Sequence, residues 1–301
     1  MSNQKLEFTA VSKFFWILFF SCILGITARA GAVADTTGKK LLAAAGKNEN
    51  AGYITLEPNV VFPEVLTGNE EEALSYIEKF SVNRRAYLIR TYNRSKKYFP
   101  KVTTVLKKQN LPQELKVLLA LESAFNGNAV SKAGAVGYWQ IMDEVAKEYG
   151  LKYAPTLTGA EKMKLQKKGV AKTGTKKTAP VKDDRKNFYK STYAAARYLK
   201  DRSRNLDNNL LLMVASYNCG IGNVWEAMKK SGLTDPDFWD IKGFLPAETQ
   251  SYVMNFIALN VIFHNYEKFS DNTLLFSPLK VKIENFDSNM SEALPEATIK
   301  K

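Results

Sequence analysis

A helical stripe of leucines that ends on an acid is the feature that most constrains this chain. Three leucines share the i, i+3 and i+4 spacing of one buried helix face: Leu115, Leu118 and Leu119. The next position of that stripe is Glu122. A carboxylate buried without a partner is costly, so this group must be paired, protonated or chemically useful. We expect the helix to begin at Pro112 and to end near Ala124, where its last side chains can reach an open cleft.

Helical periodicity dominates the rest of the chain as well. Apolar residues recur at helical spacing in segments that we predict as helices: about 70–98 with a break near Ser81, a short helix after Pro100, 136–150, 186–204, 209–218, 222–230 and 247–269. Strand-like alternation is scarce except in the C-terminal stretch LKVKIENF. The sequence therefore predicts a mainly α fold.

The N-terminus is typical of a secretory signal. Lys5 and Lys13 precede the apolar run FFWILFFSCILGI, and the small-residue triplets ARA and AVA follow it. The run is shorter than the roughly 20 apolar residues of a membrane span. We predict that residues 1–34 are a signal peptide cleaved after Ala30 or Ala34, with a retained N-terminal anchor as the alternative. The protein would then be secreted across the inner membrane into the periplasm or cell envelope, with membrane association as an open option.

Composition divides the remainder into a leader at 35–68, a helical domain at 69–270 with a Lys-rich loop at 161–182, and a polar tail at 271–301.

The chain has 43 Lys and Arg against 30 Asp and Glu, which indicates an anionic partner such as phospholipid or acidic wall polymer. A soluble basic surface without a specific partner is the alternative. The Lys-rich loop has no aromatic residue to stack on bases, so we expect no nucleic-acid partner.

The small number of cysteines and histidines argues against disulfides, against catalysis by a histidine base and against a metal site. Cleavage of the signal removes Cys22 and leaves Cys219 alone, so we expect no internal disulfide. His264 is the only histidine and lies in an apolar helical pattern, which speaks against Ser-His-Asp and Cys-His catalysis. No residues stand at metal-ligand spacing, so the sequence predicts neither a metal nor a cofactor.

Short motifs follow one another in a fixed order along the helical region. They are ES at 122–123, SKAGAVGYWQ at 131–140, DDR at 183–185, ASYNCG at 215–220 and ETQSYV at 248–253. Together they resemble the soluble-lytic-transglycosylase catalytic domain of glycoside hydrolase family 23, over about residues 98–269. The resemblance implies a goose-lysozyme-like helical domain with a substrate cleft. It also implies cleavage of peptidoglycan between N-acetylmuramic acid and N-acetylglucosamine.

The same resemblance implies a catalytic role for Glu122. It implies substrate-binding positions at Ser123, Ser131, Gln140, Tyr217, Asn218, Glu248 and Tyr252. Cleaving a glycosidic bond needs a general acid, and an exposed glutamate with a pKa of about 4.3 is ionised at neutral pH. A partly apolar wall such as the leucine stripe raises the pKa of such a group. Taken without the other motifs, a helix-end glutamate that reaches water is the ordinary interpretation.

Several of the motif residues also have ordinary structural interpretations. Tyr217 could be a core aromatic residue, and Glu248 could favour the first turn of its helix. The GAVG stretch at 134–137 is either a turn or backbone that approaches a sugar closely. Core packing is preferred over a sugar-platform role for three tryptophans: Trp139, Trp225 and Trp239. A structural ion pair is preferred for the Asp183–Asp184 pair beside Arg185.

The chain departs from the family pattern after WQIM, where Pro and then Ser or Thr are usual and Asp143 and Glu144 stand here. Cys219 replaces a usual alanine. We expect a lytic transglycosylase that forms a 1,6-anhydro sugar without consuming water. Two alternatives remain, a goose-type lysozyme that uses water and a non-catalytic protein of peptidoglycan binding or assembly.

Overall fold

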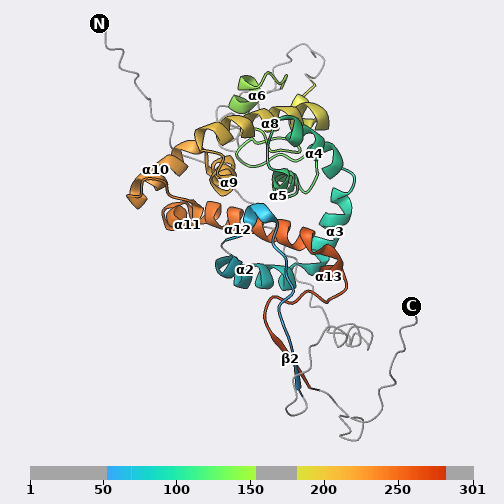
Figure 1. Ribbon diagram of the computed structural model, residues 1–301. Helices are drawn as coiled ribbons and strands as arrows, with labels where there is room; N and C mark the ends of the chain where they lie inside the picture. Colours follow the sequence, from blue (N-terminus) through green and yellow to red (C-terminus); the bar gives the residue numbers. More distant parts are fainter. Residues whose placement is uncertain (1–52, 69, 154–181, 283–301) are drawn as a thin grey trace, which may run out of the picture.

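The computed structural model describes residues 53–68, 70–153 and 182–282 (Figure 1). The predicted signal peptide, the Lys-rich loop apart from Lys182, and most of the predicted tail lie outside the described residues. Helices make up most of the described chain, so the predicted mainly α class is confirmed. No helix among the described residues combines the length and apolar character that crossing a membrane requires.

The elements follow one another in a simple order. Most elements are α-helices, and short 3-10 helices stand between some of them. In chain order they are η1 (Glu64–Leu66), α2 (Glu70–Asn83), α3 (Arg85–Ser95), α4 (Phe99–Lys108), η2 (Gln113–Val117), α5 (Leu118–Ser123), α6 (Asp143–Glu148), η3 (Asp184–Lys186), α8 (Phe188–Asn205), α9 (Leu210–Cys219), α10 (Ile221–Ser231), α11 (Phe238–Ile241), η4 (Lys242–Phe244), α12 (Ala247–His264) and α13 (Tyr266–Ser270). Strands β1 (Tyr53–Leu56) and β2 (Leu279–Lys282) pair antiparallel below the helices (Figure 1).

Helix α12 forms the centre of the fold (Figure 1). It packs against α2 on one side and against α9, η2 and α5 on the other. Its middle is buried almost all round, from Val253 to Ile262. A helix that is apolar on every face must be covered by neighbours on every face. The fold therefore uses α12 as a shared wall, and the residues at its N-terminal end face the helices that carry the other motifs.

The predicted helix over 136–150 is wrong for its first half. The structure has α6 only from Asp143 to Glu148. Before it, Val136 pairs by isolated bridges with Val130 on one side and Ile141 on the other. The backbone at Gly137 has φ of 85°, which a helix cannot contain. Side-chain periodicity could not reveal this, because pairing between short extended segments replaced the helical hydrogen bonds.

Other predicted boundaries need smaller corrections. The break in the first helical region falls at Arg84 rather than near Ser81, and the last long helix is interrupted at Asn265. The leader was expected to be irregular, yet it contains β1, whose partner β2 lies in the predicted alternating stretch. A strand of four residues is too short to show its period without its partner.

Candidate active site

The leucine stripe forms the wall that the sequence predicted. Leu115, Leu118 and Leu119 are fully buried, and Glu122 follows them on α5, one residue before the helix ends. The residue Glu122 is half-buried, so part of it is in contact with the core and part is open to solvent. Burial raises the pKa of the Glu122 carboxyl to about 7. The position that looked anomalous in the sequence is thus a poorly solvated acid at a helix end.

Helix α5 ends abruptly on two residues in the left-handed region. Ala124 has φ of 46° and Phe125 has φ of 66°, and neither is glycine. Such conformations cost free energy and persist only where surrounding contacts impose them. Arg94 of α3 supplies one such contact, because its Nη1 donates a hydrogen bond to the Ala124 carbonyl at 2.8 Å. No sequence signal pointed to Arg94, since it lies far from every motif.

The carboxyl group of Glu122 meets α12. The Tyr252 hydroxyl donates a hydrogen bond to Glu122 Oε1. This hydrogen bond lowers the pKa of Glu122, while the negative charge of Glu248, one turn earlier on α12, raises it; burial remains the largest effect. Burial and the nearby Glu122 also raise the pKa of the Tyr252 hydroxyl, which therefore stays a hydrogen-bond donor at neutral pH. The predicted residues Glu122, Tyr252 and Glu248 are brought together.

Tyr217 lies on α9 beside the same carboxyl group. Burial first, and then the proximity of Glu122 and Tyr198, raise the pKa of its hydroxyl. The hydroxyl donates to the Trp139 carbonyl at 2.8 Å. The ring meets Tyr198 edge to face, with centroids 5.6 Å apart. Tyr217 is therefore both a packed aromatic residue and a polar neighbour of Glu122, which joins the two interpretations that the sequence left open.

Three other predicted residues hold the loop that precedes α6. Ser123 is buried, and its hydroxyl donates to the Tyr138 carbonyl at 2.8 Å. Gln140 donates to the Gly137 carbonyl at 2.9 Å, and Ser131 accepts from the Ala135 amide at 2.9 Å. These contacts fix the loop against α5. A direct contact of these three side chains with substrate stays a prediction.

Asn218 lies at the C-terminal end of α9 and meets the start of α12. Its side-chain oxygen accepts a hydrogen bond from the Thr249 hydroxyl at 2.7 Å. Glu248, the neighbour of Thr249, is exposed in the first turn of α12. The hydrogen bond between Asn218 and Thr249 ties the ASYNCG motif to the ETQSYV motif. The ends of α9 and α12 therefore present Asn218 and Glu248 close to each other.

Arg185 holds the segments that carry Asp143, Asp183 and Gly137 together. Its guanidinium is fully buried and forms ion pairs with Asp183, at 2.8 Å, and with Asp143. The predicted structural ion pair at DDR is thus confirmed, and Asp143, noted only as a departure from the family pattern, is part of it. The Arg185 carbonyl lies so close to Gly137 that a Cβ there would be 2.0 Å from it. Gly137 therefore approaches protein backbone closely, which explains why no side chain fits there.

The three tryptophans have different environments. Trp139 is buried and donates to Thr192 at 3.0 Å, as the core interpretation predicted. Trp225 is 48% exposed, so its assignment to the core is wrong. Trp239 is half-buried and packs against the core. It also lines a cavity of about 300 Å³ together with residues of α2, α9 and α12, and Glu122 is not part of that lining.

Among the described residues, no group of three His, Cys, Asp or Glu side chains could hold a metal ion.

Comparisons with known proteins show what this chain is similar to. The family described as Transglycosylase SLT domain matches residues 103–238. The chain is 31% identical over 190 residues to membrane-bound lytic murein transglycosylase D of Escherichia coli, an alignment that covers 62% of this chain and 36% of the relative. The chain thus spans about a third of the length of that curated relative.

Two solved structures are also similar. One is the 70-kDa soluble lytic transglycosylase of Escherichia coli, at 16% identity and a TM-score of 0.43, covering 70% of this chain and 33% of that chain. The other is an inactive mutant of the lytic transglycosylase Slt from Pseudomonas aeruginosa, at 20% identity and a TM-score of 0.39, covering 71% of this chain and 33% of that chain.

The domain match places one family of domains in this chain. Residues 103–238 match the Transglycosylase SLT domain, as the motifs predicted. The expected SLT-type helical domain is confirmed by this match and by the helices of the structure. The chain is similar to membrane-bound lytic murein transglycosylase D over 190 residues.

Proposed function

We propose that this protein is a peptidoglycan lytic transglycosylase, with Glu122 as its catalytic acid and base. The observation that carries the proposal is the Glu122 carboxyl group itself, held at a helix end with its pKa raised to about 7 by burial. A carboxylic acid that is half-protonated near neutral pH can donate a proton to a leaving oxygen and can later accept one. The relative is named a murein transglycosylase, which supports peptidoglycan as the substrate.

In the proposed first step, Glu122 donates its proton to the oxygen that bridges the two sugars, and the bond from that oxygen to the anomeric carbon breaks. In the second step, the 6-hydroxyl of the same muramic acid attacks its own anomeric carbon. Its proton passes to the Glu122 carboxylate, which restores the acid. An internal nucleophile that is already oriented avoids much of the entropic cost of attack. The product is a 1,6-anhydro sugar.

The surroundings of Glu122 favour this route over hydrolysis. A hydrolase of the two-carboxylate type places its second carboxylate about 5–5.5 Å away to form a covalent intermediate, or about 6.5–9.5 Å away to activate water. Within the described part of the chain, Tyr252 and Tyr217 lie beside Glu122, and their hydroxyls remain protonated at neutral pH because their pKa values are raised. Glu248 is the motif carboxylate near Glu122, and it lies exposed in the first turn of α12. We assign Glu248 to substrate positioning, as the resemblance implied.

We assign the substrate contacts to the residues that meet at the ends of α5, α9 and α12. Tyr217, Asn218, Glu248 and Tyr252 would contact the sugars directly. Ser123, Ser131 and Gln140 would contribute through the loop that they hold. We further propose the predicted organisation, with a signal peptide at 1–34, an enzymatic domain at 69–270 and a location in the periplasm or cell envelope. The similarity to a membrane-bound relative supports an envelope location.

The decisive experiment is mass spectrometry of purified sacculi after digestion. A transglycosylase releases muropeptides that end in anhydromuramic acid and are lighter by one water than lysozyme products. Reducing-end muramic acid as the sole product would replace the proposal with a goose-type lysozyme. Binding of sacculi without any soluble product would support the non-catalytic alternative.

A further inference from the structure

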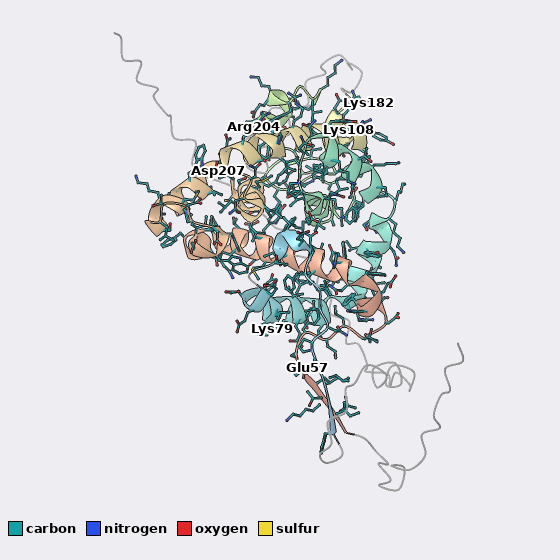
Figure 2. All side chains as sticks on the ribbon, in the orientation of Figure 1. Glu57, Lys79, Lys108, Lys182, Arg204 and Asp207 are labelled. Carbon is teal, nitrogen blue, oxygen red and sulfur yellow. The ribbon has the colours of Figure 1, made fainter. Side chains whose placement is uncertain are left out.

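The surface formed by α4 and α8 combines positive charge with exposed aromatic rings. Residues 79–113 contain ten Lys and Arg and no Asp or Glu, and α4 lies within this stretch. Lys97, just before α4, and Lys101, on it, are exposed. On α8, Tyr189 is 56% exposed and Tyr193 is 44% exposed. We call these four residues the α4–α8 face, and Figure 2 shows side chains projecting from this side of the molecule, with Lys108 and Lys182 labelled near it.

The two helices contribute to the face as one unit. Helices α4 and α8 pack against each other. The ammonium group of Lys101 lies over the Tyr189 ring at 5.6 Å from its centroid, and that of Lys97 lies over the Tyr98 ring at 5.5 Å. Tyr189 and Tyr193 stand four residues apart on α8 and so share a side of that helix. The only acid in α8 is Asp201, near its C-terminal end.

The face is continuous with the candidate active site through a run of aromatic rings. Phe125, three residues after Glu122, stacks on Tyr98 at 5.1 Å between centroids. Tyr98 meets Phe188 at 5.3 Å, and Phe188 meets Tyr189 at 5.4 Å. The run therefore leads from the end of the catalytic helix to the exposed ring that Lys101 covers.

The chemistry of the face selects a particular ligand. Exposed tyrosine rings offer a flat apolar surface with a polar edge, which suits the face of a sugar. Lysines beside them attract carboxylates over a distance of several ångströms. A bilayer surface would instead call for apolar side chains that insert below the headgroups. The large exposed apolar residues of α4 and α8, within the described part of the chain, are the two tyrosines alone.

We propose that the α4–α8 face is an accessory binding surface for an anionic glycan strand that extends beyond the catalytic cleft. Tyr189 and Tyr193 stack on sugar rings, and Lys97 and Lys101 contact carboxylates of the muramic acid or its peptide. The glycan's identity as peptidoglycan rests on the proposed function. The face would hold a long strand near the enzyme between cleavage events.

The test measures binding without cleavage. In a Glu122→Gln background, co-sedimentation with purified sacculi is compared between the Lys101→Ala/Tyr189→Ala variant and a matched control, Lys229→Ala/Tyr53→Ala. The control removes one lysine and one exposed tyrosine from α10 and β1 instead. We expect about ten-fold weaker binding for the α4–α8 variant at low salt, a smaller loss at high salt, and no change for the control. Lys101→Glu should weaken low-salt binding as well, as a second variant that keeps the tyrosines.

Two further probes separate the alternatives. Chitin, a neutral glycan, should show a loss for Lys101→Ala/Tyr189→Ala but little effect of Lys101→Glu. Vesicles of phosphatidylglycerol and phosphatidylethanolamine should show no difference between the α4–α8 variant and the control. Equal binding of both double variants to sacculi would overturn the proposal, and so would a loss that appears on vesicles alone. If the protein with its native Glu122 releases no muropeptides, while the α4–α8 variant still binds sacculi more weakly than the control variant, the proposed catalytic function fails and the binding surface stands.

Discussion

The hydroxyl of Tyr252 donates a hydrogen bond to Oε1 of Glu122, although the two residues are 130 positions apart in the chain. This contact links the last turn of α5 with the second turn of α12. It places a neutral donor, which cannot ionise near neutral pH, against a carboxyl group whose pKa is about 7. Burial and this hydrogen bond, which act in opposite directions, together set the pH range over which Glu122 can donate a proton.

We expect activity to fall with rising pH through an alkaline limb near pH 7. Glu122 must be protonated to donate to the leaving oxygen, and its pKa is about 7, so the active form is lost above that pH. The limb should be visible in kcat/KM for a short soluble glycan substrate measured between pH 5 and 9. A rate that is flat through this range would show that the group is not the acid.

Substitutions at Tyr252 and Glu248 should move this limb in opposite directions. The Tyr252 hydrogen bond lowers the pKa of Glu122, so Tyr252→Phe should shift the limb to higher pH. The charge of Glu248 raises the same pKa, so Glu248→Gln should shift the limb to lower pH. The Glu248 effect acts through solvent and should shrink as salt is added. Shifts of the same sign in both variants would contradict the described arrangement.

Replacing Glu122 by Gln should abolish cleavage and stabilise the fold at alkaline pH. We expect at least about a 100-fold loss of turnover, because the amide cannot donate and retrieve the proton. The raised pKa of Glu122 means that its contribution to stability is present below about pH 4.5 and is lost as pH rises through 7. The neutral glutamine avoids this loss, so Glu122→Gln should gain up to about 3 kcal/mol relative to wild type at pH 8 and nothing at pH 4. Thermal unfolding at both pH values measures the difference.

Gly137→Ala should destabilise the protein far more than Gly150→Ala. Both glycines have positive φ, 85° and 74°, so both substitutions carry the strain of a left-handed alanine, about 1–2 kcal/mol. Only at Gly137 does the new Cβ also meet backbone, the Arg185 carbonyl at 2.0 Å, whereas nothing lies within 4 Å at Gly150. We expect a loss above about 3 kcal/mol for Gly137→Ala by urea unfolding. Equal losses would show that Arg185 can move aside.

Asp143→Ala should cost about 2 kcal/mol of folding free energy. It removes a carboxylate paired with the fully buried Arg185, and the pair with Asp183, also among the described residues, limits the loss. Arg204→Ala is the matched control, because its pair with Asp201 is exposed and should be worth less than about 1 kcal/mol. A loss no larger than that of the control would mean that Arg185 does not depend on Asp143.

The candidate site was accessible from the sequence to the extent that local patterns encode it. The leucine stripe placed Glu122 at a buried helix end without any knowledge of its partners, because helical spacing depends only on neighbouring residues. The motifs named Tyr217, Tyr252 and Glu248, and the structure brings these around Glu122. Arg94 could not be found in this way, since nothing in its own segment shows that it binds the Ala124 carbonyl.

The sequence by itself determined most of the helical segments and which carboxyl group ends the buried stripe, because both follow from interactions within a few residues. Tertiary structure alone decided that 136–142 is not a helix, because Val136 exchanges backbone hydrogen bonds with Ile141, and Gly137 donates to the Ala129 carbonyl. It also decided that Asp143 pairs with Arg185, because the two residues are 42 positions apart and sequence periodicity relates only near neighbours. The pKa of Glu122 belongs to this second group, since it depends on how much water the packed α5, α9 and α12 leave around one carboxyl group.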